Sequence, residues 1–174
     1  MSGAHNYINM FNLKGRKAIV TGGSRGIGKA LAEALAAHGA DVAIVVKSSL
    51  ERAEKLAADL KASGTDSFAI QADVALEDDV QRMTDAVIER WGRIDILVNN
   101  AGIVLPAAAE DCALEDWRKT MSVNLDGVFL VSRAVGRQMI AQKSGSIINI
   151  GSMSGRIVNW PFRHAAYNVS KAGV

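Results

Sequence analysis

The sequence predicts an α/β fold, a doubly wound parallel sheet with helices on both faces, and three observations support this. Short apolar runs alternate along the chain with longer segments of helical periodicity. A glycine-rich turn joins the first apolar run directly to the first helical segment. The 174 residues are 49% hydrophobic, which is enough for one domain with its own core. Such alternation is typical of a parallel sheet whose crossover connections are helices.

The expected elements follow in order along the chain. Strands are expected at residues 17–21, 42–46, 68–71, 94–98 and 146–150, and helices at residues 27–38, 50–62, 77–91 and 117–142. A last helix begins near residue 165, and the sequence ends at Val174, about two turns later. We therefore expect residues 1–174 to be a single domain that is incomplete at its C-terminus. Its fifth strand would be an exposed apolar edge, which predicts poor solubility.

The composition excludes several classes of function. Lys and Arg number 20 against 18 Asp and Glu, and the net charge of +2 gives no broad basic surface for nucleic acid. Cys112 is the single cysteine, so no internal disulfide can form and no structural metal site is expected. No run approaches the roughly 18 apolar residues of a membrane span, and residues 1–11 contain no apolar targeting core. These features predict a cytoplasmic protein that binds neither nucleic acid nor membrane.

The turn after the first expected strand has the sequence T-G-G-S-R-G-I-G, from Thr21 to Gly28. Gly22 permits a sharp turn, Gly26 lets the backbone come close to a pyrophosphate, and Gly28 permits close packing of the helix. The helix N-terminus adds free N–H groups and the positive end of its dipole. The predicted phosphate-binding residues are Gly22, Ser24, Arg25, Gly26, Ile27 and Gly28. A glycine-rich turn without a ligand is the alternative.

The end of the second strand indicates which dinucleotide fits. An acidic side chain there would bind a ribose 2′-hydroxyl, and a basic one would accept a 2′-phosphate. The residues at this place are Val46 and Lys47, and Arg25 of the glycine turn can approach the same point. The pattern favours NADP(H) over NAD(H). The alternative is that Lys47 is simply a solvated residue after a strand.

Two further segments follow strand ends at the same edge of the sheet. Asn100, Ala101 and Gly102 come after the fourth strand, where ligands of open α/β sheets bind and where small residues leave room. An ordinary turn is the alternative for this segment. Asp73 and Val74 come after the third strand, and the alternative for Asp73 is a helix N-cap. We include these five residues in the predicted dinucleotide site.

Four side chains in the second half of the chain are candidates for the reacting groups. Tyr167 and Lys171 are four positions apart, so a helix places both on one face. An ammonium favours ionisation of a neighbouring phenol, which makes proton transfer near neutral pH easier. Ser152 follows the fifth strand, where a hydroxyl can bond a substrate oxygen as charge develops. Asn124 lies within a predicted helix, a position that asparagine does not favour. Taken singly, each residue has the alternative of an exposed or turn position.

In this order behind a T-G-x-x-x-G-x-G turn, the four residues resemble the Asn-Ser-Tyr-Lys tetrad of the short-chain dehydrogenase/reductase family. The resemblance covers nearly the whole chain and implies a Rossmann-type fold. It implies NADP(H)-dependent hydride transfer between a ketone and a secondary alcohol. Tyr167 would exchange the proton at the substrate oxygen and border the cofactor, Lys171 would hold the nicotinamide ribose, and Ser152 would orient the substrate. Asn124 would anchor a water of a proton relay, and Asp73 would accept from the adenine amino group.

The loop between the serine and the tyrosine bears on the substrate. Its sequence S-M-S-G-R-I-V-N-W-P resembles that of the polyol and keto-sugar dehydrogenases of the family, whereas acyl-carrier-protein reductases have a shorter, glycine-rich loop. A 3-oxoacyl-[acyl-carrier-protein] reductase is therefore the first alternative, and a non-catalytic nucleotide-binding fragment is the alternative from another class. The polar and aromatic side chains that could contact a sugar are Asn159, Trp160, Phe162, Arg163 and His164. Of these, His164 is expected to be solvated and not catalytic.

The resemblance also implies a homotetramer for the complete protein. Members of the family commonly associate through the helix expected at residues 117–142 and through the helix that carries the tyrosine and lysine. They normally continue with two more strands, a Pro-Gly turn beside the nicotinamide and a lid over the substrate. The sequence ends before these parts, so a chain of this length is expected to be inactive by itself.

Overall fold

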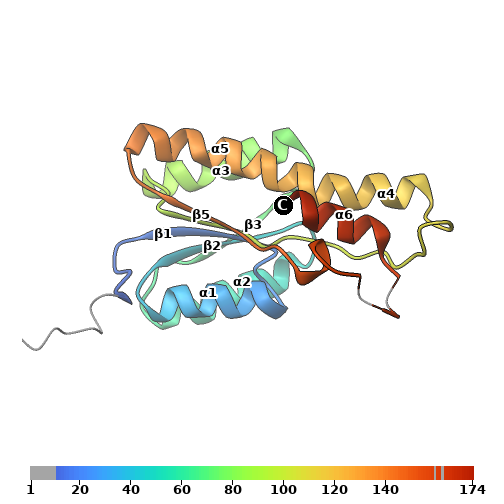
Figure 1. Ribbon diagram of the computed structural model, residues 1–174. Coiled ribbons are helices and arrows are strands. Elements are labelled where there is room, and N and C mark those ends of the chain that lie inside the picture. The colour runs from blue at the N-terminus through green and yellow to red at the C-terminus, as the bar shows by residue number, and fades with distance from the viewer. Residues whose placement is uncertain (1–10, 159, 162) are drawn as a thin grey trace, which may run out of the picture.

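The computed structural model describes residues 11–158, 160, 161 and 163–174. Its centre is a five-stranded sheet with the strand order β3-β2-β1-β4-β5 (Figure 1). The strands are β1 (Lys17–Thr21), β2 (Asp41–Val46), β3 (Phe68–Gln71), β4 (Ile96–Asn99) and β5 (Ser146–Asn149). Every adjacent pair is parallel, and Ala18 of β1 is in register with Val42 on one side and Ile96 on the other. The direction of strand succession therefore reverses at β1, which is a topological switch point.

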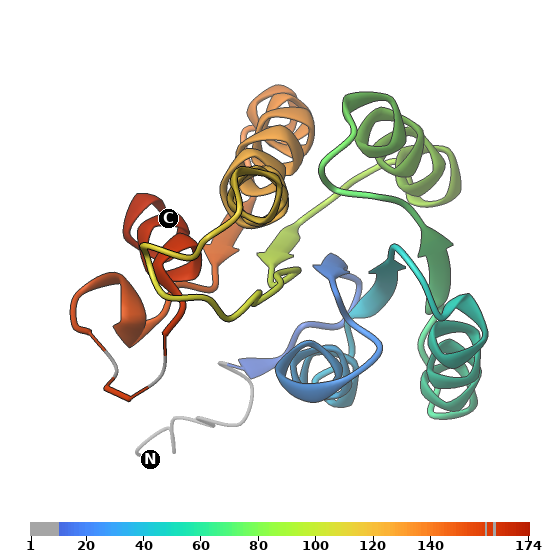
Figure 2. The ribbon, with the colours of Figure 1, turned by 90° about the vertical axis from the view of Figure 1, so that its right-hand side faces the viewer.

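Helices cover both faces of the sheet (Figures 1 and 2). α1 (Gly26–Ala37) and α2 (Leu50–Ala62) lie on one face, and α3 (Glu77–Trp91) and α5 (Gly127–Gln142) lie on the other. Alternate residues of β1 serve the two layers, because Ile19 packs in the core with α3 and α5, whereas Ala18 and Val20 pack with α1 and α2. A central strand buried on both faces needs a continuous apolar run. The predicted doubly wound α/β fold is confirmed.

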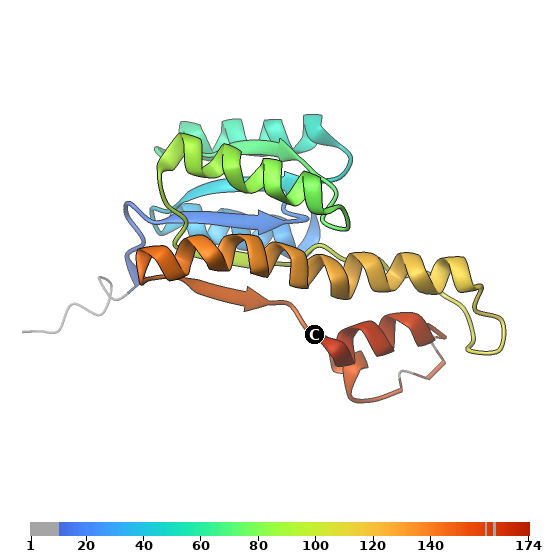
Figure 3. The same cartoon turned by 90° about the horizontal axis from the view of Figure 1, so that it is seen from above.

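The single helix predicted at residues 117–142 is in fact two helices joined by a π-helical turn. α4 (Leu114–Met121) begins three residues earlier than predicted, the turn η2 spans Ser122–Asp126, and α5 continues in nearly the same direction (Figure 3). The prediction missed the turn because the apolar periodicity continues through it. Asn124 lies in this turn, and single π-helical turns within helices often occur at functional sites.

The last described elements lie at the carboxyl edge of the sheet. The chain runs from β5 through a 3-10 turn η3 (Met153–Gly155) to α6 (Ala165–Gly173), and α4 and α6 both extend beyond the strand ends (Figure 3). All four residues of β5 are exposed, including Ile147 and Ile148, which confirms the predicted apolar edge. Among the described residues, no helix is long and apolar enough to cross a membrane.

Candidate active site

A cavity of about 630 Å³ opens at the carboxyl ends of β1, β2 and β4. This is the switch point, where open α/β sheets bind their ligands, and the volume is in the usual range for ligand and cofactor pockets. Apart from the two residues on α6, all residues predicted to bind a dinucleotide line this cavity. They are Gly22, Ser24, Arg25, Gly26, Ile27, Gly28, Lys47, Asp73, Val74, Asn100, Ala101 and Gly102. Segments distant in sequence meet here because parallel strands end at one edge of the sheet.

The glycine turn has the backbone conformation that its sequence predicts. Gly22 and Gly26 have positive φ angles of 65° and 53°, which a side chain would strain. A Cβ atom on Gly28 would lie less than 3.0 Å from the carbonyl oxygen of Gly22 and from Nδ2 of Asn100. A Cβ atom on Gly26 would meet no other atom within 4 Å. Gly28 is therefore required for packing, whereas Gly26 borders free space at the N-terminus of α1, where an anion is favoured.

Two asparagines tie the end of β4 to the strands beside it. Asn100 donates from Nδ2 to the main-chain oxygens of Thr21, at 3.0 Å, and of Gly22, at 3.2 Å. Asn99 donates from Nδ2 to Oδ1 of Asn149 at 2.9 Å. These bonds hold the glycine turn, β4 and β5 in fixed positions around the cavity. The N-N-A-G segment is therefore more than a surface turn.

Four cationic side chains line the cavity, and three of them, Arg25, Lys47 and Arg52, lie in the glycine turn and in the segment after β2. Lys47 forms an ion pair with Asp73, with 2.6 Å between Nζ and Oδ2, and its side chain is otherwise largely exposed. Arg25 and Arg52 have no salt bridge to another residue in the described part of the chain. Asp73 also accepts from the main-chain nitrogen of Ala75 at 3.1 Å, so it stabilises the turn that precedes α3. It is not the N-cap of that helix, which is the alternative role considered above.

Sequence reasoning missed several residues of the cavity. Ser48, Ser49 and Arg52 follow Lys47 in the loop and first turn after β2, and Ile103, Lys119 and Val123 line the side formed by the loop after β4, by α4 and by η2. Arg52 could have been found, because a cation five positions after Lys47 in an exposed first helical turn is close to the strand end. Lys119 and Val123 carry no sequence signal, since only the fold brings α4 and η2 to this edge.

The tyrosine and lysine lie together on α6, as their spacing predicts. Nζ of Lys171 is 5.9 Å from the ring centre of Tyr167. Lys171 is only 8% exposed, and its Nζ donates to the main-chain oxygen of Ile150 at 2.6 Å. Burial lowers the pKa of the Lys171 ammonium below its usual range, because desolvation penalises the charged form. Neither residue lines the 630 Å³ cavity directly.

Asn124 connects the cavity to α6. Its Oδ1 accepts from the main-chain nitrogen of Ile103 at 2.8 Å, and its Nδ2 donates to the main-chain oxygen of Ile103 at 2.9 Å and to Oγ of Ser170 at 3.0 Å. Ser170 in turn donates to the main-chain oxygen of Tyr167 at 2.8 Å. The Asn124 side chain has no exposed surface and all three bonds are internal. It therefore joins three segments of the site.

Ser152 lies at the start of η3, which packs against α6. Its Oγ accepts from the main-chain nitrogen of Ser154 at 3.1 Å. A Cβ atom on Gly155 would lie 2.8 Å from the main chain of Lys171, so the turn after Ser152 rests directly on α6. The described residues form no hydrogen bond between Ser152 and Tyr167. The Ser152 hydroxyl proton remains available to an external acceptor.

The loop before α6 differs from expectation at His164. This residue was expected to be solvated, but it is half-buried and its ring stacks on that of Tyr167, with 5.5 Å between ring centres. The correction follows from its position at the N-terminus of α6, three residues before the tyrosine and thus on the same side of the helix. Trp160 is 77% exposed. The predicted contacts of Asn159 and Phe162 lie outside the described residues.

Residues 16–174 match the family model described as short chain dehydrogenase. This chain belongs to the short-chain dehydrogenase/reductase family. The resemblance depends on three motifs: the glycine turn, the N-N-A-G segment and the helix that carries Tyr167 and Lys171. The family assignment predicted from those motifs is therefore confirmed.

The relatives within the family include proteins with different substrates in their names. The chain is 46% identical to galactitol 2-dehydrogenase of Rhizobium johnstonii, over 97% of its length and 65% of the relative's. It is 44% identical to 3-oxoacyl-[acyl-carrier-protein] reductase of a Synechocystis strain, over 95% of its length and 66% of the relative's. The chain thus spans slightly less than two thirds of the length of these curated relatives, and its near-equal identities do not choose between their substrates.

A solved structure agrees with the fold over almost the whole chain. NADPH-dependent 3-quinuclidinone reductase of Rhodotorula rubra superposes with a TM-score of 0.91 at 39% sequence identity, and the match covers 99% of this chain and 65% of that one. The five-stranded sheet and its helices are therefore those of the family.

Proposed function

We propose that this protein is an NADP(H)-dependent oxidoreductase that interconverts a ketone and a secondary alcohol by hydride transfer. One connection carries the proposal. Ile103 lines the dinucleotide cavity and is bonded on both main-chain groups by Asn124. Asn124 is also bonded to Ser170, the residue before Lys171 on α6. A proton-transferring pair is thus fastened to a cavity suited to a dinucleotide, as hydride transfer to a carbonyl requires.

The residues of the cavity fit NADP(H). The open space beside Gly26 and the N-terminus of α1 suit a pyrophosphate. Lys47, Arg25 and Arg52 suit the doubly charged 2′-phosphate, which favours NADP(H) over NAD(H). The name of the Rhodotorula relative points to the same cofactor. When bound, the nicotinamide supplies or accepts the hydride.

The side chains of the chain itself would handle the substrate oxygen and its proton. Ser152 accepts a bond from Ser154, so its own hydroxyl proton is free to bond the substrate oxygen and stabilise developing charge. The Tyr167 hydroxyl would give the proton to this oxygen in reduction and take it back in oxidation. Lys171 uses one N–H on Ile150, which leaves two for the hydroxyls of the ribose. Its charge would stabilise the phenolate of Tyr167.

We propose a polyol or keto-sugar as the substrate. The S-M-S-G-R-I-V-N-W-P sequence and the similarity to galactitol 2-dehydrogenase support this choice. A 3-oxoacyl thioester is the second candidate, because the identity to the acyl-carrier-protein reductase is nearly as high. A dinucleotide-binding fragment without turnover is the candidate from another class.

One assay separates these candidates. Consumption of NADPH by the full-length protein is followed with fructose, xylulose and an acetoacetyl thioester in parallel, and the best substrate is repeated with Tyr167→Phe. We expect turnover with a ketose, little with the thioester, and a rate reduced at least about a hundredfold in the variant. NADPH binding by the variant, measured by fluorescence, should be kept. Undiminished turnover by Tyr167→Phe would refute the mechanism, and a preference for the thioester would refute the substrate.

We also propose that the protein is a cytoplasmic homotetramer that associates through α5 and α6. Phe129 and Ile140 of α5 are 60% and 78% exposed, and Val169 of α6 is 46% exposed, which suits a contact surface. Light scattering coupled to gel filtration tests this directly. A monomeric mass at micromolar concentration would contradict it.

A further inference from the structure

Tyr167 is flanked on its own helix by an aromatic ring and by an ammonium. The His164 and Tyr167 rings are 5.5 Å apart between centres with an interplanar angle of 23°, which is an offset stack. Lys171 approaches the tyrosine ring from the following turn, at 5.9 Å. The three residues are spaced three and four positions apart, so they form one row on α6. The phenol ring is therefore bounded from both directions along the helix.

The ring face of His164 contacts Tyr167, whereas its Nδ1 atom forms no hydrogen bond among the described residues. Nδ1 is buried and accepts or donates no hydrogen bond among the described residues. A buried polar atom without a partner is destabilising, so this nitrogen contributes nothing to holding the loop. The aromatic face is the part of the side chain that contacts another residue, because it stacks on the Tyr167 ring. An imidazole nitrogen sealed in this way is also poorly placed to exchange protons with a substrate.

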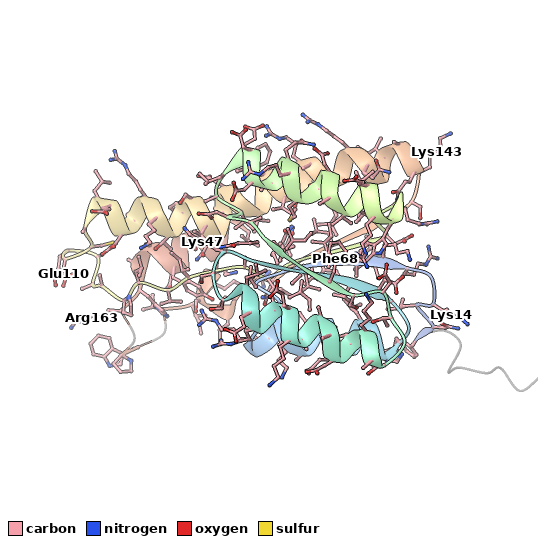
Figure 4. All side chains as sticks on the ribbon, turned by 180° about the vertical axis from the view of Figure 1, so that it is seen from behind. Lys14, Lys47, Phe68, Glu110, Lys143 and Arg163 are labelled. Atoms are coloured by element: carbon pink, nitrogen blue, oxygen red, sulfur yellow. The ribbon has the colours of Figure 1, made fainter. Side chains whose placement is uncertain are left out.

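The backbone around His164 is anchored to a second segment. His164 forms a parallel bridge with Ala107, in the loop after β4. Nη1 of Arg163 lies 4.0 Å from Oε1 of Glu110 in the same loop, and Figure 4 shows these two side chains at the same end of the molecule. The main-chain oxygen of His164 accepts from the nitrogen of Asn168 in the first turn of α6. Contacts on both sides thus hold the imidazole at a fixed place relative to the helix.

We propose that His164 is a positioning residue for Tyr167, acting through the face of its imidazole ring. The stack restricts rotation of the phenol ring about its first side-chain torsions, so that the hydroxyl is directed at the substrate oxygen. The inference deepens the proposed function and rests on the role given there to Tyr167. It assigns His164 no proton transfer. The aromatic plane should therefore suffice, whatever its heteroatoms.

Three variants separate an aromatic plane from bulk and from the imidazole nitrogens. His164→Phe keeps the plane, His164→Leu keeps much of the bulk without the plane, and His164→Ala removes both. We expect kcat with the best ketone to fall about three- to tenfold in the Ala and Leu variants and to stay within about twofold of wild type in the Phe variant. The Kd for NADPH should stay unchanged in all three. His164→Phe should melt at or above the temperature of the wild type, because it removes an unpaired buried nitrogen.

A spectroscopic measurement tests the stack without relying on turnover. The sequence contains two tyrosines, Tyr7 and Tyr167, so ring-labelled tyrosine gives signals that Tyr167→Phe assigns. We expect the Tyr167 ring signals of wild type and His164→Phe to be displaced by the neighbouring ring current. In the Ala and Leu variants they should move toward the values of an unstacked tyrosine. Unmoved signals in His164→Ala would overturn the proposal.

The two readouts also distinguish this inference from the proposed function. Wild-type protein without ketone reduction would refute the proposed function, and the ring signals would still decide whether His164 orders Tyr167. Active wild type with an undiminished kcat in His164→Ala would overturn the positioning role alone. A Leu variant as active as the Phe variant would do the same, because bulk would then suffice.

Discussion

The ammonium of Lys171 donates to the main-chain oxygen of Ile150 across 2.6 Å, which fastens α6 to the segment that leaves β5. The same nitrogen lies 5.9 Å from the centre of the Tyr167 ring, and the lysine residue is only 8% exposed. The lysine thus joins the segment after β5 to the tyrosine that we propose as the proton donor. Its charge is kept in a largely dehydrated place, which has a measurable consequence for the pH dependence of stability.

We expect the stability that depends on Lys171 to increase at alkaline pH. Burial lowers the pKa of this ammonium in the folded state below its usual 10.5, so between the two pKa values the unfolded chain binds more protons. The contribution of this group to the free energy of unfolding therefore rises with pH between the two pKa values. Below the folded-state pKa, the cost of burying the charged ammonium opposes folding in full. The difference in Tm between cofactor-free wild type and Lys171→Met should shift in favour of wild type from pH 7 to pH 10. A constant difference would contradict this.

Alanine substitutions at two glycines of the turn after β1 should have different effects, one on folding and one on the proposed binding of phosphate. Gly28→Ala places a Cβ less than 3.0 Å from backbone of the turn itself, so we expect a large loss of Tm or insoluble protein. Gly26→Ala meets no atom within 4 Å and should fold, with backbone strain of about 1 kcal/mol. Its methyl would occupy the space left for the pyrophosphate, so NADPH binding should weaken at least about tenfold.

Gly92→Ala is the matched control for Gly26→Ala. Gly92 has a positive φ of 71°, a Cβ atom added there would meet no atom within 4 Å, and the residue ends α3 away from the cavity. Both variants should lose similar amounts of Tm, but only Gly26→Ala should lose NADPH affinity in a fluorescence titration. Equal affinities in the two variants would show that the space beside Gly26 is not used by the cofactor.

Removal of the Lys47 charge should affect NADPH more than NADH. Lys47→Ala deletes one cation of the cavity and leaves the Asp73 carboxylate without its ion pair, so a 2′-phosphate meets less attraction and more repulsion. We expect the KM for NADPH to rise about ten- to a hundredfold, and that for NADH to change by less than about twofold. Lys55→Ala, an exposed change on α2 outside the cavity, is the control. Equal effects on both cofactors would contradict the assignment of the 2′-phosphate.

Asn124→Ala should destabilise the protein as well as the site. The change removes three buried hydrogen bonds and leaves both main-chain groups of Ile103 without partners, which costs about 2–4 kcal/mol in the free energy of unfolding. Urea denaturation measures this loss. Ser170→Ala removes the bond from Asn124 to α6 and the bond from Ser170 to the main-chain oxygen of Tyr167, but keeps both bonds to Ile103, and should cost about 1–2 kcal/mol. An Asn124→Ala protein as stable as wild type would mean that these hydrogen bonds contribute no net stability.

The sequence predicted the parts of the site that depend on local pattern. The glycine turn is a short segment whose backbone requirements are visible in its residues, and the spacing of Tyr167 and Lys171 needs only one helix to bring them together. The residues missed are those that reach the cavity from another element. Lys119 belongs to it because α4 meets the edge of the sheet, and nothing in its own neighbourhood signals this. The π-helical turn was not predicted, because one additional residue in a helical turn hardly changes the apolar periodicity.

The amino-acid sequence by itself determined the order of strands and helices, the family, and many of the residues that line the cavity, since each of these follows from periodicity or from motifs of a few residues. Only the tertiary structure decided that Asn124 is a buried link between Ile103 and Ser170, and that His164 is stacked on Tyr167 instead of solvated. The physical reason is that a pattern in one segment indicates which of its faces is apolar. The partners of its polar atoms come from other segments, 21 and 46 residues away in the case of Asn124, and packing alone selects them.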